Sequence, residues 1–106
     1  MSQQGTDTIS VFGVRIRMTQ ERWQHVVREH PELEGLSKEV LATVGNPEKV
    51  LAGNYGELLA LKEIIPGKYL VVAYKEIDVD DGFVITAFLS KRIRQLDKRV
   101  VIWPKQ

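Results

Sequence analysis

The sequence predicts a single α+β domain in which N-terminal helices pack on an antiparallel β-meander of four or more strands. Three observations lead to this prediction. The chain has 106 residues, 43% hydrophobic and 27% charged, which suffices for one folded core and is too few for two. Apolar residues recur at helical spacing before residue 46 and at strand spacing after it. Tight-turn residues divide the second half into short segments, as is typical of consecutive antiparallel strands.

The first residues are polar and precede any periodic pattern. We expect residues 1–8 to form a flexible tail and residues 9–106 to form the domain. Residues 9–16 alternate loosely between apolar and polar side chains, which predicts a first strand.

Two helices are predicted next. Thr19 is a typical N-cap, and the helix that it starts should end at Pro31, because the residue before a proline avoids the helical conformation. Ser37 is the expected cap of a second helix, which the run Gly45-Asn46-Pro47 should end.

The second half of the chain carries three turn signals that separate four strand-like segments. The turns are 53–56, 66–67 and 80–82, and the strands are 48–53, 58–65, 69–77 and 83–90. Residues 99–103 predict a further edge strand that Pro104 ends. Helices with one apolar stripe each should cover one face of this sheet and leave the other face free for a site.

Composition excludes several classes of site and location. The absence of cysteine excludes disulfides, thiolate chemistry and cysteine-bound zinc. With two histidines, and with Leu89 where a calcium loop starting at Asp78 needs an acid, we expect no metal and no cofactor. No apolar run reaches the roughly 20 residues that cross a bilayer, and the N-terminus lacks the pattern of a secretory signal. We therefore expect a soluble, cytoplasmic protein with no membrane partner.

The basic residues are unevenly placed although the net charge is only +1. Five of the fifteen fall within residues 91–99, whereas acidic residues gather within 76–81. A local basic cluster on a near-neutral chain favours a phosphate-bearing ligand bound at one place, and a solvated surface is the ordinary alternative.

Four residues stand out as chemical candidates. His25 and His30 lie on the first predicted helix, His30 on its apolar face and His25 away from it. They are the natural acid–base candidates, because a histidine exchanges its proton near neutral pH. Lys62 and Thr86 each interrupt an otherwise apolar strand. Each also has an ordinary role, as a core histidine, a surface histidine, an edge lysine and a β-forming threonine, and spacing alone favours that role for the histidines and the threonine.

In order along the chain, six motifs resemble a known family. They are Thr19-x-Glu21-Arg22-Trp23-x-His25-Val26, His30-Pro31-Glu32-Leu33, Asn46-Pro47-x-x-Val50, Lys68-Tyr69-Leu70-Val71-Val72, Asp81-Gly82-Phe83-Val84-Ile85-Thr86-Ala87-Phe88 and the closing Trp103. Over residues 15–103 the chain resembles the phage and bacterial Barnase–EndoU–colicin–RelE-like nucleases, especially their second phage-type branch.

The resemblance implies a helical segment on a four-stranded antiparallel sheet and metal-independent RNA cleavage, often by a toxin. It implies RNA as substrate and an antitoxin or immunity protein as partner. Carried over residue by residue, it assigns catalytic positions to His25, His30, Lys62, Thr86 and Arg92. Lys62 stands where the family pattern has an arginine, which keeps the charge and loses the bidentate fork.

Metal-free cleavage of RNA needs a base for the 2′-hydroxyl proton, an acid for the leaving 5′-oxygen and cations on the phosphate. Either histidine suits the acid or the base, and their assignment stays open. Two other functions also stay open on this fold. One is a non-catalytic module that binds RNA or the ribosome, and the other is a protein-interaction module of phage or mobile-element origin.

Overall fold

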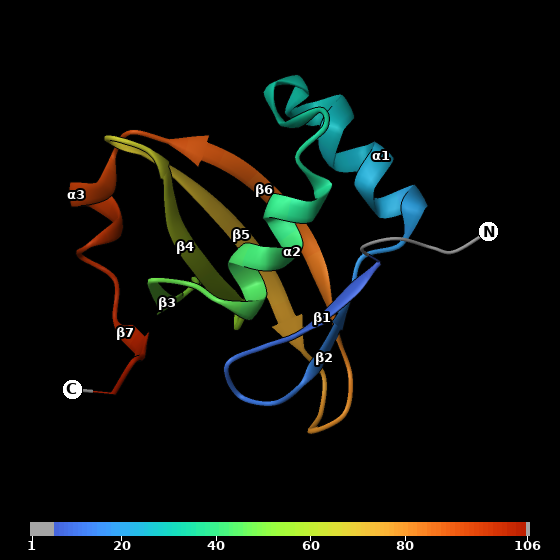
Figure 1. Ribbon diagram of the computed structural model, residues 1–106. Helices are drawn as coiled ribbons and strands as arrows, with labels where there is room; N and C mark the ends of the chain where they lie inside the picture. Colours follow the sequence, from blue (N-terminus) through green and yellow to red (C-terminus); the bar gives the residue numbers. More distant parts are fainter. Residues whose placement is uncertain (1–5, 106) are drawn as a thin grey trace.

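The computed structural model describes residues 6–105, which form helices on a single mixed sheet (Figure 1). The helices are α1 (Gln20–Glu29), the 3₁₀ helix η1 (Pro31–Leu33), α2 (Ser37–Gly45) and α3 (Ile93–Leu96). The strands are β1 (Asp7–Ile9), β2 (Arg15–Arg17), β3 (Lys49–Ala52), β4 (Leu58–Ile65), β5 (Lys68–Glu76), β6 (Gly82–Ser90) and β7 (Val101–Trp103). The predicted α+β class is confirmed.

The sheet has the strand order β1-β2-β6-β5-β4-β3-β7. Strands β3 to β6 pair consecutively and antiparallel, as the turn signals predicted. The predicted edge strand near the C-terminus is β7, which pairs with β3. The sequence did not reveal that β2 pairs with β6 in parallel, through Ile16 with Gly82 and Arg17 with Phe83.

The N-terminal segment differs from its prediction. The strand expected over 9–16 is two short strands, β1 and β2, joined by a turn in which Gly13 has a φ of +83°. The buried hydroxyl of Ser10 organises that turn: it accepts the backbone N–H groups of Phe12 and Val14 and donates to Glu76 at 2.7 Å. Of the expected tail, residues 1–5 lie outside the described residues, whereas Asp7 and Thr8 belong to β1.

The first helix follows its prediction and the second departs at its cap. Oγ1 of Thr19 accepts the N–H of Arg22 at 3.0 Å, and α1 ends before Pro31. The N-cap of α2 is Leu36, and Ser37 is the first helical residue. No side chain makes a capping hydrogen bond at this end of the helix. Leu36 packs against the core, and burying an aliphatic side chain outweighs a capping bond of about 1 kcal/mol.

Apolar side chains fill both faces of the sheet. On one face, α1 and α2 bury Val26, Val40 and Val44 against the sheet. The opposite face carries a second cluster, formed by Leu51, Leu59, Leu61, Val71 and Ala73, against which Ile93, Leu96 and Val101 pack. The expectation that this face stays free is therefore wrong where α3, which was not predicted, packs on it.

Candidate functional site

Helix α1 lies alongside β6, beyond the point where β2 stops pairing with that strand (Figure 1). Nη1 of Arg22 donates to the carbonyl oxygen of Ile85 at 3.3 Å. Further along, the rings of His30 and Phe88 have centroids 6.1 Å apart and an interplanar angle of 36°. The helix therefore runs along the edge of β6, with Arg22 next to Ile85 and His30 next to Phe88.

An open hollow of about 420 Å³ lies at the first turns of α1. It is lined by Thr19, Glu21, Arg22 and His25. Glu21 and His25 are four residues apart and Arg22 and His25 three apart, so one helical face carries all three side chains. The half-exposed His25 has Nε2 3.4 Å from Oε2 of Glu29, one turn further on, which favours one orientation of the ring.

A second hollow, of about 220 Å³, adjoins the first. It is lined by Arg17, Thr19, Arg22, Phe83 and Val84. The two hollows share Thr19 and Arg22 in their linings, and we call the two together the α1–β6 groove.

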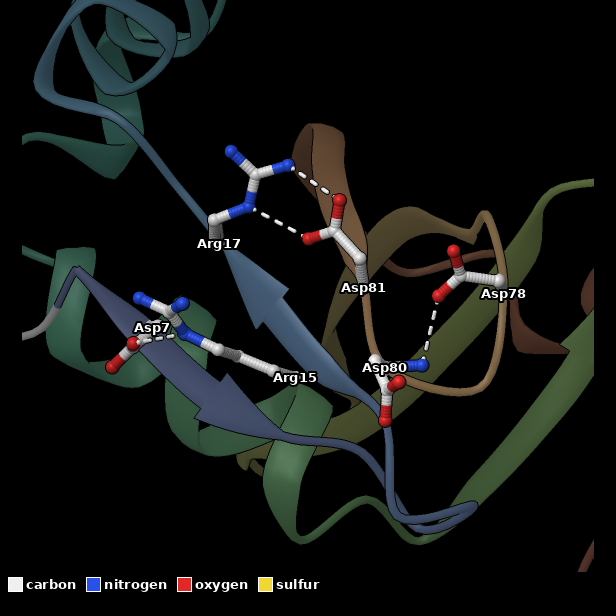
Figure 2. A network of polar contacts seen from close by, with 6 residues as sticks. All are labelled: Asp7, Arg15, Arg17, Asp78, Asp80 and Asp81. Atoms are coloured by element: carbon white, nitrogen blue, oxygen red, sulfur yellow. Dashed lines mark hydrogen bonds and ion pairs between the residues drawn. The ribbon is translucent and has the colours of Figure 1, made fainter.

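Arg17 is held firmly at one side of this groove. Its Nε and Nη2 donate to the two carboxylate oxygens of Asp81 at 2.8 and 2.9 Å, in the bidentate arrangement that Figure 2 shows. Both side chains are more than a third exposed, so the pair contributes at most about 1 kcal/mol to stability. Its main effect is to fix the plane of the guanidinium group.

The α1–β6 groove combines three kinds of chemistry. Glu21 offers a carboxylate, which can accept a proton, and His25 offers an imidazole, which can donate one. Arg22 has a guanidinium group, which binds phosphate oxygens through paired N–H donors. These are the groups that a metal-independent transfer at a phosphodiester needs.

His25 is the one sequence-predicted residue that lines the groove. His30 is the C-cap of α1, and its Nδ1 lies 3.7 Å from Oε2 of Glu32. Its ring is turned to Phe88, in the arrangement of a packed aromatic pair.

The structure does not bring Lys62 and Thr86 together. Lys62 pairs with Leu70, which is buried on the helix-covered face, whereas Thr86 pairs with Ala73 on the opposite face. The expected convergence of these two side chains is therefore not found. The reason is the register, since successive side chains of a strand alternate between faces.

Arg92 lies beyond the C-terminal end of β6, where its backbone N–H donates to Oγ of Ser90. Phe83 lines the groove at the start of the same strand, and the seven residues from there to Ser90 extend roughly 23 Å. Arg99, from the same basic segment, is bound to Ala52 and Asn54. The basic cluster at 91–99 is thus not a part of the groove.

Thr86 has a buried hydroxyl that makes no hydrogen bond among residues 6–105. Since an unpaired buried hydroxyl destabilises the folded state, Thr86→Val should leave the free energy of unfolding unchanged or raise it by about 1 kcal/mol. Denaturant unfolding measures this, and RNA cleavage by the same variant should equal that of the wild type. A stable variant that cleaves RNA poorly would show that the Thr86 hydroxyl takes part in cleavage.

Sequence reasoning missed Glu21, Arg22, Arg17 and Phe83. A signal for Arg22 was present, because at helical spacing Arg22 falls, like His25, away from the apolar stripe of α1. Arg17 and Phe83 gave no such signal, since they meet only through the parallel pairing of β2 and β6.

Among residues 6–105, no three histidine, aspartate or glutamate side chains gather closely enough to hold a metal ion. No helix in this range has the length and apolar character needed to traverse a bilayer.

Comparison of the chain with protein-family models, with curated proteins and with solved structures found no match. The resemblance to the Barnase–EndoU–colicin–RelE-like nucleases thus stays an expectation that rests on the quoted motifs. Function is inferred from the residues of the groove.

Proposed function

We propose that the protein is a metal-independent endoribonuclease of toxin type, with its reactive groups in the α1–β6 groove. One observation carries the proposal: Glu21, Arg22 and His25 line the same hollow. A carboxylate, a guanidinium and an imidazole there supply a base, a phosphate-binding cation and an acid.

The reaction follows from these groups. Glu21 accepts the proton of a ribose 2′-hydroxyl, and the 2′-oxygen attacks the adjacent phosphorus. The bond from phosphorus to the 5′-oxygen breaks as His25 gives that oxygen a proton. The products are a 2′,3′-cyclic phosphate and a 5′-hydroxyl, while Arg22 stabilises the charge on the pentacoordinate phosphate. The substrate is RNA, because DNA lacks the 2′-hydroxyl that acts as nucleophile.

The decisive experiment incubates purified protein with RNA in the presence of a chelator and identifies the new ends. We expect 2′,3′-cyclic phosphate and 5′-hydroxyl ends. An oligodeoxynucleotide carrying a single ribonucleotide should be cut only at that ribose, and the all-deoxy oligonucleotide should stay intact. Intact RNA after incubation with folded protein would reject the proposal.

A non-catalytic RNA-binding module is the second candidate function. The observation that favours it is the separation of Lys62 from Thr86, since the residues expected to act together lie on opposite faces of the sheet. RNA binding by the wild type without cleavage, unchanged in His25→Ala, would support this candidate. For the ribonuclease, an antitoxin or immunity protein that covers the groove is the expected protein partner.

A further inference from the structure

Three side chains form a row on neighbouring strands at one end of the sheet. Phe83 of β6 pairs with Arg17 of β2 on one side and with Lys75 of β5 on the other. Paired residues point to the same face, so the ring of Phe83 stands between two cationic side chains. Arg17 and Lys75 are two strand spacings apart, about 9.6 Å.

The row faces away from the helix-covered core. Ile16 and Val84, the strand neighbours of Arg17 and Phe83, are buried in the helix-covered core, so Arg17 and Phe83 point to the other face. Among the described residues, Phe83 belongs to neither apolar cluster, and it is only partly buried. An aromatic ring that fills no core and lines a groove is available to a ligand.

The charges around Phe83 suit a nucleic acid strand. Asp81 already occupies two donors of Arg17, so Arg17 borders the ring as a fixed positioning group. Arg22 lines the same hollow as Phe83 and supplies positive charge there, whereas the exposed Lys75, which pairs with Phe83, has its ammonium near Gly56. Bases stack on aromatic side chains while neighbouring cations hold the backbone, which is a common way of binding single strands.

We propose that Phe83 is the stacking platform for one unpaired nucleobase, with a flanking phosphate held by Arg22. This inference rests on the proposed function and names its substrate class, single-stranded RNA cut next to the stacked base. Arg22 lines both the hollow that contains Phe83 and the hollow that contains His25, and in this proposal it links the stacked base to the reacting phosphate.

The test measures binding apart from cleavage. The probe is a short, mixed-sequence, fluorescently labelled single strand with 2′-O-methyl riboses, which blocks the nucleophile. Stacking contributes about 1–3 kcal/mol per base, so Phe83→Ala should weaken binding about 5- to 150-fold. Phe83→Trp should bind as tightly as the wild type or more tightly, and Phe83→Leu should bind nearly as weakly as Phe83→Ala, because leucine has no π face.

Phe12→Ala is the matched control, because Phe12 is exposed on the turn between β1 and β2, outside the groove, and its removal should not change binding. Thermal unfolding shows that each variant is folded. If Phe83→Ala does not fold, the comparison of Phe83→Leu with Phe83→Trp is sufficient for the test. Wild-type affinity in Phe83→Leu, or equal binding of the duplex form of the probe, would overturn the inference.

The two proposals can fail separately. Phe83-dependent binding without cleavage of unmodified RNA would reject the ribonuclease and keep the stacking site. Cleavage that is unaffected by Phe83→Leu would keep the ribonuclease and reject the stacking site.

Discussion

Replacement of His25 by alanine is expected to slow RNA cleavage by roughly two to four orders of magnitude, the usual contribution of a positioned proton donor. The protein should stay folded, because the side chain is 45% exposed and its charge contact with Glu29 lies at the surface. The initial rate of cleavage in the presence of a chelator measures the effect, and thermal unfolding checks the fold. His25→Gln, which keeps polarity and loses proton transfer, should be equally slow.

His30→Ala is the matched control on the same helix. Its ring packs beside Phe88 and outside the groove, so this change should lower the free energy of unfolding by about 0.5–1.5 kcal/mol and spare the cleavage rate per folded molecule. A stable but inactive His30→Ala together with an active His25→Ala would show the opposite. The reacting histidine would then be His30, at the end of α1, and not His25 in the groove.

Gly82→Ala is expected to destabilise the protein by about 3 kcal/mol, the upper part of the usual range for overpacking. A Cβ at this position would lie 2.6 Å from Cδ1 of Ile16 and 3.1 Å from Cα of Glu76, and it would collide with the carbonyl oxygen of Lys75. Two of these three atoms are backbone atoms of β5, which cannot move aside without breaking the ladder. Denaturant unfolding measures the loss.

Gly67→Ala separates steric collision from backbone strain. Gly67 has a φ of +80°, but a Cβ there would meet no atom within 4 Å. Its replacement should therefore cost only the strain of a left-handed alanine, about 1–2 kcal/mol. If Gly82→Ala costs no more than Gly67→Ala, the close approach of β2, β5 and β6 at Gly82 does not limit stability.

Gly82 also shows where sequence reasoning stops. Following Asp80 and Asp81, it resembles an ordinary turn glycine, and the turn was predicted correctly. In the structure its φ is not positive, and it is needed because β2 and β5 approach its backbone from both sides. A turn signal is local, whereas this requirement arises between residues 66 positions apart in the sequence, Ile16 and Gly82.

The sequence by itself determined the elements whose signals are local. Helical spacing and the Thr19 cap define α1, and alternation between turn residues defines β3 to β6, because both patterns depend on neighbours within a few residues. The same spacing placed His25 away from the apolar face of that helix. Three features were decided only by tertiary structure. They are the register that separates Lys62 from Thr86, the parallel pairing that puts Arg17 beside Phe83, and the alignment of α1 with β6. Each depends on how distant segments share one buried core, and no local pattern records that.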